Sequence, residues 1–148
     1  MLINDQISLE IHEMNKIIRD PFLMATCRRL SHGGGSGMNQ ALDHYQTLDR
    51  SIDARGIFAN LSDKYIGWAL CTRETDIYYY KPVPGTAAFQ IYVDPTYRRK
   101  GIGRMLLRKA KSLVPNEDLL VYGNDGHYFF GALMNEGLCS SIYERDRR

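Results

Sequence analysis

The sequence predicts an α+β fold, in which a central β-sheet is combined with several helices. Three observations support this prediction. Residues 87–114 read as a buried strand, a glycine loop and an amphipathic helix, and residues 56–74 read as a β-hairpin. The chain has 148 residues, of which 44% are apolar and 24% charged, as is usual for a soluble globular protein. We therefore expect one domain, spanning residues 1–148.

The N-terminal part predicts a strand and then a helix. Residues 6–12 alternate loosely, with the apolar side chains on one side, which favours a first strand; continuation into a helix is the alternative. Asp20 and Pro21 have the pattern of an N-cap and a first helical residue. A helix is therefore expected from Pro21 to about Leu30.

A glycine-rich segment separates this helix from a second one. Residues 33–37 read Gly-Gly-Gly-Ser-Gly, which is costly to hold in regular structure and predicts a flexible loop. Residues 39–55 have apolar side chains along one helical face, so we expect a second helix there. These side chains are Leu42, Tyr45, Leu48 and Ile52.

The middle of the chain predicts two antiparallel strands. Residues 57–61 and 65–70 are rich in apolar, aromatic and β-branched side chains, and a short turn through residues 62–64 joins them. Residues 76–85 hold three consecutive tyrosines and two prolines. Because proline cannot donate to a β-ladder, we expect this segment to be a connection at the edge of the sheet.

The stretch from residue 87 to residue 114 contains the most specific signal. Residues 87–93 predict a buried strand, which Asp94 and Pro95 end. After the glycine loop, apolar residues recur at steps of three and four, which predicts an amphipathic helix. These residues are Ile102, Met105, Leu106, Ala110, Leu113 and Val114.

The start of this helix has the chemistry of an anion site. The first N–H groups of a helix have no partner within the helix, and the helix dipole places partial positive charge there. Gly101 and Gly103 remove side chains that would keep an anion away. Residues 98–111 carry seven cationic side chains and no acidic one, although the net charge of the chain is only +2. A diphosphate fits this site better than a single carboxylate does.

The C-terminal part predicts two more strands and a short helix. Residues 118–122 form a buried apolar run, and residues 128–136 form a short apolar segment that we expect to be helical. Gly137 is the expected C′ glycine of this helix. Residues 138–144 predict a last strand.

Composition argues against several other classes of protein. The three cysteines are odd in number and far apart, so no disulfide framework is expected. Free cysteines are typical of reducing compartments, so we expect an intracellular, cytoplasmic setting. The N-terminus does not read as a signal peptide, and no apolar stretch approaches the ~20 residues of a membrane span. The four histidines have no metal-ligand spacing, so no metal is expected.

The strand, the sequence Arg98-x-x-Gly101-x-Gly103 and the following helix resemble motif A of the GNAT superfamily of N-acetyltransferases. In that family the motif holds the pyrophosphate of acetyl-CoA. A kinase glycine loop would need a strand after its glycines, and a Walker A loop would need Gly-Lys-Ser/Thr, which is absent. The elements follow the family order along the whole chain, but the resemblance is specific only for residues 87–108.

This resemblance implies the fold and the cofactor site. The implied fold is an α/β/α sandwich with a mixed, mostly antiparallel sheet, a splayed central strand pair and helices on both faces. Acetyl-CoA is the implied co-substrate, and the N–H of Val93 is the implied contact for the thioester carbonyl. The implied cofactor-binding residues are Ile91, Tyr92, Val93, Arg98, Arg99, Lys100, Gly101, Ile102, Gly103, Arg104 and Asn124.

The acid and the base of the reaction are less defined. The strand offers Gln90 where many family members have a glutamate base, and the usual tyrosine acid of the last helix is absent from its expected position, which is Leu133 or Gly131. Tyr128 and His127 lie nearby and are the candidate catalytic residues. For each, a structural role is the alternative, and a base acting through water is another.

The same resemblance implies that the acceptor is an amine of a small molecule or of a protein. We expect the protein to be a monomer or a homodimer. In the family, the connection between the first two helices lies over the acceptor pocket, so residues 33–37 form either a lid or a plain surface loop. A CoA-binding regulatory module is the alternative function. Nucleic-acid binding ranks last, because one cofactor explains the basic residues and no base-stacking motif accompanies them.

Overall fold

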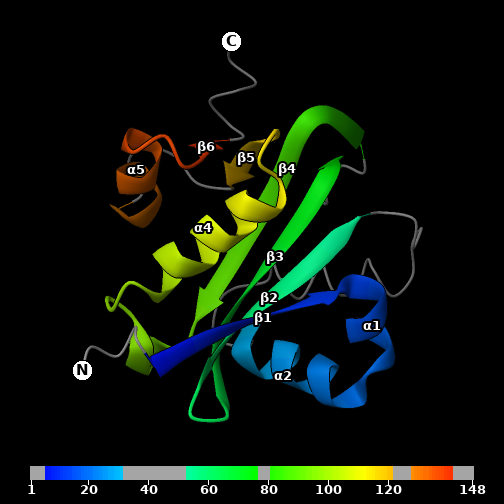
Figure 1. Cartoon of the computed structure of the whole chain (residues 1–148), viewed down its shortest axis with the longest axis vertical. Coiled ribbons are helices and arrows are strands. Elements are labelled where there is room, and N and C mark those ends of the chain that lie inside the picture. Colours follow the sequence, from blue (N-terminus) through cyan, green and yellow to red (C-terminus); the bar gives the residue numbers. More distant parts are fainter. Residues whose placement is uncertain (1–5, 32–52, 77–80, 122–127, 142–148) are drawn as a thin grey trace.

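A computed structural model gives the structure of the chain and describes residues 6–31, 53–76, 81–121 and 128–141. Over these residues, six strands form one mixed sheet in the order β1-β2-β3-β4-β5-β6 (Figure 1). The first four strands are antiparallel, whereas β4–β5 and β5–β6 are parallel. The strands are β1 (Ile7–Glu13), β2 (Ala54–Leu61), β3 (Lys64–Asp76), β4 (Lys81–Val93), β5 (Asp118–Val121) and β6 (Ser140–Ser141).

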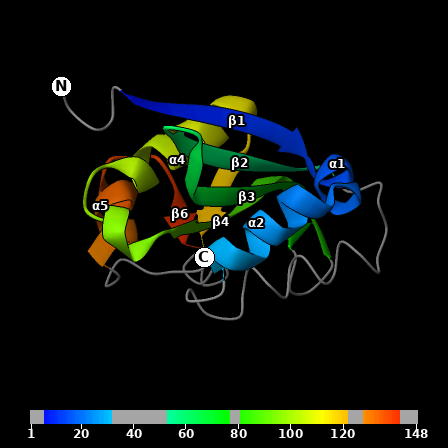
Figure 2. The same ribbon diagram turned by 90° about the horizontal axis from the view of Figure 1, so that it is seen from below.

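Helices cover both faces of this sheet, as Figures 1 and 2 show. The helices α1 (Met14–Arg19) and α2 (Pro21–Ser31) lie on one face, and α4 (Ile102–Leu113) crosses the other. The helix α5 (Tyr128–Asn135) lies beside α4 (Figure 1). The predicted α/β/α sandwich with a mixed, mostly antiparallel sheet is confirmed.

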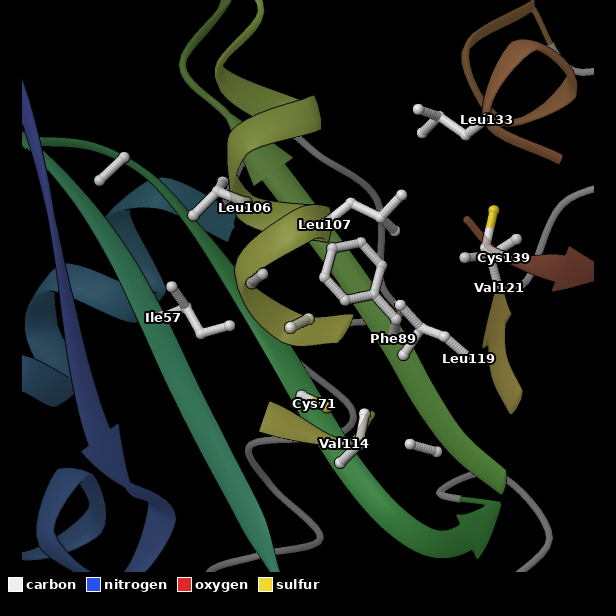
Figure 3. Packing of buried hydrophobic residues seen from close by; sticks show 14 of the residues in the cluster. Ile57, Cys71, Phe89, Leu106, Leu107, Val114, Leu119, Val121, Leu133 and Cys139 are labelled. Atoms are coloured by element: carbon white, nitrogen blue, oxygen red, sulfur yellow. The ribbon is translucent and has the colours of Figure 1, made fainter. Parts of the chain in front are cut away.

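Two hydrophobic cores result, one on each face. The period of two along a strand sends neighbouring side chains to opposite faces. In β4, Phe89 therefore belongs to the core under α4, while Tyr92 packs against the core under α1 and α2. The first core includes Ile57, Leu106, Leu107 and Val121 (Figure 3), and the second includes Phe58, Trp68, Leu23 and Leu30.

The predicted N-cap of the first long helix is confirmed. Asp20 Oδ1 accepts hydrogen bonds from the backbone N–H groups of Phe22 at 2.9 Å and Leu23 at 3.2 Å, and Pro21 is the first residue of α2. The short helix α1 ends just before this cap, and continuation of the first strand into a helix was predicted only as an alternative. Its six residues follow β1 directly, and they are too few to show a helical period in the sequence.

This cap supports a prediction about stability. Asp20→Ala should lower the melting temperature by about 2–4 °C, because losing an N-cap costs about 1 kcal/mol. Asp20→Asn keeps a side-chain acceptor and should lose less than half as much. Thermal unfolding followed by circular dichroism would measure both variants, and an unchanged melting temperature for Asp20→Ala would contradict the energetic role of the cap.

Two predicted boundaries in the middle of the chain are wrong. The helix expected over residues 39–55 cannot extend to its predicted end, because Ala54 and Arg55 already pair with Thr72 and Cys71 in the sheet. The remainder of that prediction, from residue 39 to residue 52, lies outside the described residues. Here tertiary pairing overrides the local helical pattern.

The segment 76–85 is also not an edge connection. β3 runs to Asp76 and β4 begins at Lys81, and the two strands pair as one long hairpin in which Asp76 lies opposite Lys81. Pro82 is accommodated near the end of this hairpin, close to a register shift between Arg73 and Thr75. The three tyrosines 78–80 lie outside the described residues.

The C-terminal elements agree with the prediction where the structure describes them. The helix α5 ends in a Schellman motif, in which Gly137 has φ +75° and the N–H of Leu138 donates to the carbonyl of Leu133 at 3.0 Å. β6 covers Ser140–Ser141, and residues 142–144 of the expected last strand are outside the described residues. Leu133 is fully buried, so this turn fixes α5 against the core under α4.

Candidate active site

The strands β4 and β5 separate at the C-terminal end of β4. They pair in parallel only from Thr86 with Asp118 to Phe89 with Val121. β4 then continues through residues 90–93, which have no partner strand on this side in the part of the chain that the structure describes. On its other side, β4 stays paired with β3 as far as Val93. The end of β4 is thus an edge of the kind expected for the splayed strand pair.

The direction of the main chain at this edge follows from one hydrogen bond. The N–H of Asp94 donates to the carbonyl of Ile66 in β3 at 2.8 Å. The structure has no cis peptide bond in its described residues, and in a trans peptide unit the N–H and the preceding carbonyl point in opposite directions. The carbonyl of Val93 therefore points away from β3, toward the side of β5. Because Val93 is extended, its own N–H faces the same side.

The turn after β4 is built by its own polar side chain and by unusual backbone angles. Asp94 Oδ1 accepts a hydrogen bond from the N–H of Thr96 at 3.0 Å and caps the short 3₁₀-helix η2 (Pro95–Tyr97). The chain then turns through two residues with positive φ, Arg99 at +64° and Gly101 at +84°. Glycine adopts this conformation without strain, whereas for Arg99 it costs about 1 kcal/mol. This turn aims the start of α4 toward the end of β4.

The first turn of α4 leaves its N–H groups available. The N-cap Gly101 has no side chain that could accept from them, and no acidic residue lies in the first turn. Gly101 instead offers its carbonyl to the N–H of Met105 at 3.1 Å, which starts the helix. Ile102 is buried and anchors the helix in the core, while Gly103 is half-buried. The N–H groups at this terminus thus have the geometry that binds an anion.

The cationic side chains around this terminus divide into two groups. Arg104 forms an ion pair with Glu136 at the end of α5, so its charge is already balanced. Arg99 and Lys100 are exposed, and neither has a partner among the described residues. The second group therefore supplies the positive charge that remains available to an anion.

The side chain of Arg98 contacts β4 and not the N-terminus of α4. Its Nε donates to the carbonyl of Val93 at 2.8 Å, and its guanidinium carbon lies 5.2 Å from the centre of the Tyr92 ring. These contacts could not be predicted from the sequence, because they depend on how closely the turn after β4 brings Arg98 back to Tyr92 and Val93.

The candidate catalytic residues lie largely outside the described part of the chain. Asn124, His127 and the glycine-rich segment 33–37 all fall there. The backbone of Tyr128 begins α5, whereas nothing is described of its side chain. Leu133, one of the two positions at which the family tyrosine was expected, is fully buried in the core.

An ion pair with a buried carboxylate at the other end of α4 could not be predicted from the sequence. Glu117 is only 5% exposed, and its carboxylate accepts from Arg73 at 2.5 Å. Lys111 Nζ donates to the backbone carbonyl of Glu117 at 2.5 Å. These contacts join the C-terminal end of α4 to β3 and to the residue before β5. We assign them to the support of the helix.

The three cysteines are buried, and burial raises the pKa of Cys27 to about 12, of Cys71 to about 12 and of Cys139 to about 11. We predict that the folded protein reacts only slowly with Ellman's reagent at pH 8, and that unfolding in urea releases all three thiols. Because the unfolded thiols ionise near pH 9, the contribution of these thiols to the free energy of unfolding should be constant well below pH 9 and should fall as the pH rises from about 9 to 12. Fast reaction of the folded protein would contradict this burial.

No three metal-ligating side chains gather within the described ranges. No helix in the same ranges is both long and apolar enough to cross a membrane.

Comparison with solved structures agrees with this fold. An aminoglycoside acetyltransferase from an uncultured soil metagenomic sample, in complex with trehalose, is 16% identical with a TM-score of 0.55, over 92% of this chain and 89% of that one. An aminoglycoside 6′-N-acetyltransferase from Acinetobacter haemolyticus is 14% identical with a TM-score of 0.58, over 88% of each chain. An aminoglycoside N-acetyltransferase in complex with CoA is 16% identical with a TM-score of 0.54, over 87% of this chain and 89% of that one. A comparison with curated proteins gives no match.

The fold together with a family model defines the class of protein as an acyltransferase. The model of the acetyltransferase (GNAT) family matches residues 14–123, which is well over half of the chain. The chain therefore belongs to the GNAT family of acetyltransferases, as the sequence motif indicated.

Proposed function

We propose that the protein transfers an acetyl group from acetyl-CoA to a primary amine. The observation that carries this proposal is the placement of the uncapped N-terminus of α4 beside the open edge of β4. The first can hold a diphosphate, and the second can hold an extended chain that ends in a thioester. Support for the nucleotide comes from the family and from the related fold that was crystallised with CoA.

The proposed reaction is a direct attack of the amine on the thioester. The C–N bond forms, the C–S bond breaks, the amine loses a proton and the departing thiolate of CoA gains one. The main task of the protein is to position the two substrates and to stabilise the negative charge that develops on the carbonyl oxygen. The N–H of Val93, which faces the side of β5, is the proposed donor to that oxygen.

The residues proposed for cofactor binding share the region from the end of β4 to the first turn of α4. The backbone of Ile91 and Val93 would pair with the pantetheine arm, and the backbone N–H groups from Lys100 to Arg104 would bind the diphosphate. Arg99 and Lys100 would add charge from their side chains, because both are exposed and lack a partner among the described residues. Tyr128 and His127 remain the candidates for the proton transfers.

The acceptor that we propose is a small-molecule amine or an amine of a protein. Aminoglycoside acetyltransferases among the related folds support the first of these. A CoA-binding module without strong activity is the second candidate function. It is favoured by the composition of the strand, since residues 87–93 contain no carboxylate that could serve as a base.

Two measurements test this proposal in sequence. Thermal unfolding with acetyl-CoA should show stabilisation that increases with ligand concentration, as mass action requires, whereas an equal concentration of duplex DNA should give none. Thiol release from acetyl-CoA should then be measured with a panel of polyamines, aminoglycosides, aromatic amines and lysine peptides. Turnover with any of them supports the enzyme, binding without turnover supports the module, and absence of binding contradicts both.

A further inference from the structure

We propose that Arg98 is a positioning residue, whose side chain holds the open end of β4 in the geometry that acetyl transfer needs and does not bind the diphosphate. This inference rests on the proposed function. It reverses the role implied for Arg98 by the family motif, in which this residue would add charge for the cofactor.

The first step of the argument is the carbonyl that Arg98 occupies. The carbonyl of Val93 points away from β3, because the N–H of the same peptide unit donates to Ile66. No neighbouring strand reaches this carbonyl in the described part of the sheet, since β5 pairs with β4 only as far as Phe89. Arg98 Nε donates to it at 2.8 Å and thus replaces the missing strand at this one position.

The second step is the surface on which the guanidinium rests. Its central carbon lies 5.2 Å from the centre of the Tyr92 ring, which is within the range of a cation–π contact. Tyr92 itself packs against the core under α1 and α2 and lies opposite Trp68 in the sheet. A hydrogen bond and a ring contact together thus hold the guanidinium of the exposed Arg98 on β4.

The third step concerns the consequence for the reacting atoms. The carbonyl and the N–H of Val93 belong to the two peptide units that meet at its Cα, and both face the side of β5. The Arg98 hydrogen bond, together with the one from Asp94 to Ile66, holds the unit next to this N–H on both of its sides. That N–H is the proposed donor to the thioester oxygen. Arg98 would therefore act through Val93 on the chemical step, while the exposed Arg99 and Lys100 serve the phosphates.

The chemistry of glutamine offers a sharp test. The Nε2 of glutamine is the same number of bonds from Cα as the Nε of arginine. Arg98→Gln therefore keeps a donor within reach of the Val93 carbonyl but removes the charge, whereas Arg98→Met removes both. Arg99→Gln is the matched control, because it removes the same charge from the neighbouring exposed residue.

The kinetic experiment measures kcat and the KM for acetyl-CoA for the three variants at one ionic strength. Arg98→Met should lower kcat about tenfold with KM within about twofold, because displacement of a reacting group by a fraction of an ångström has effects of this order. Arg98→Gln should recover kcat to within about threefold of the natural protein, and Arg99→Gln should raise KM. If Arg98→Gln and Arg98→Met are equally impaired and both raise KM as Arg99→Gln does, Arg98 binds phosphate and the inference is overturned.

A spectroscopic measurement separates this inference from the proposed function. Val93-Asp94 is the only Val-Asp pair in the sequence, so in protein labelled with ¹³C-carbonyl valine and ¹⁵N aspartate only the Val93 carbonyl carbon is bonded to ¹⁵N. A spectrum that selects ¹³C–¹⁵N bonded pairs therefore gives one carbonyl signal, that of Val93. The signal should be the same in the natural protein and in Arg98→Gln, and it should move in Arg98→Met as the hydrogen bond is lost. An unmoved signal in Arg98→Met would refute the contact, whether or not acetyl-CoA binds. Failure of the natural protein to bind acetyl-CoA would instead refute the proposed function.

Discussion

Gly103→Asp is expected to raise the Kd for CoA by at least about 100-fold. Gly103 is the second residue of α4, where the helix N–H groups would face the diphosphate. A carboxylate about 4 Å from one phosphate charge is repelled by about 4 kcal/mol at an effective dielectric constant near 20. Screening by salt reduces this repulsion, and a remainder of about 3 kcal/mol corresponds to the 100-fold change. Isothermal titration calorimetry would measure it.

The fold of this variant should remain intact, since an acidic residue in the first turn of a helix is stabilising by about 0.3–1 kcal/mol. Gly103→Asn is the matched control, because asparagine has nearly the same size as aspartate and no charge. It should weaken binding much less than Gly103→Asp does. Equal losses for the two variants would show that size alone matters there, and an unchanged Kd for Gly103→Asp would refute the anion site.

Phe89→Ala is expected to lower the free energy of unfolding by about 3–5 kcal/mol, which is the usual cost of removing a buried phenyl ring. Phe89 is 1% exposed, and Figure 3 shows its ring between α4 and the sheet, near Leu107 and Leu119. The same residue begins the part of β4 where β5 leaves the ladder. The loss should appear as a lower midpoint of urea unfolding with little change in the slope.

Phe22→Ala is the matched control for this substitution. Phe22 is the second residue of α2 and is 67% exposed, with a tilted contact between its ring and that of Tyr65. The same chemical change should therefore cost less than about 0.5 kcal/mol there. A similar loss for the two variants would mean that Phe89 is not part of the core on which α4 packs.

The parts of the fold that were predictable are those specified by local sequence. Asp20 and Pro21 mark the start of α2, Asp94 and Pro95 mark the end of β4, and Gly137 marks the end of α5; each acts within a few residues of itself. The strand, loop and helix around the anion site are likewise contiguous. Their backbone directions follow from glycine and proline chemistry, and the structure agrees with them.

The errors arose where distant pairing decides the structure. Ala54 and Arg55 continue a helical pattern in the sequence, but they are strand residues because β3 pairs with them. The hairpin of β3 and β4 is longer than its sequence indicates, since Pro82 is tolerated near its end. The ion pair of Glu117 and Arg73 joins residues 44 positions apart, a separation at which no local pattern is informative.

The same limit applies within the candidate site. The glycines and the cationic residues are evident in the sequence. The sequence does not indicate which cationic side chains contact other residues of the protein and which stay exposed. The side chain of Arg98 turns back onto Val93, although it was expected to add charge for the cofactor. The side chain of Arg104 pairs with Glu136, just after α5, which leaves the backbone N–H that was expected to bind the diphosphate unaffected. The exposed side chains of Arg99 and Lys100 remain as the proposed source of charge for the diphosphate.

A crystal structure with bound CoA tests the central claim most directly. We predict that oxygen atoms of the diphosphate lie within about 3.2 Å of backbone nitrogen atoms between Lys100 and Arg104, at the N-terminus of α4. The pantetheine arm should then run along the open edge of β4 toward Val93. A diphosphate bound to another part of the surface, with the first turn of α4 left to solvent, would contradict the account.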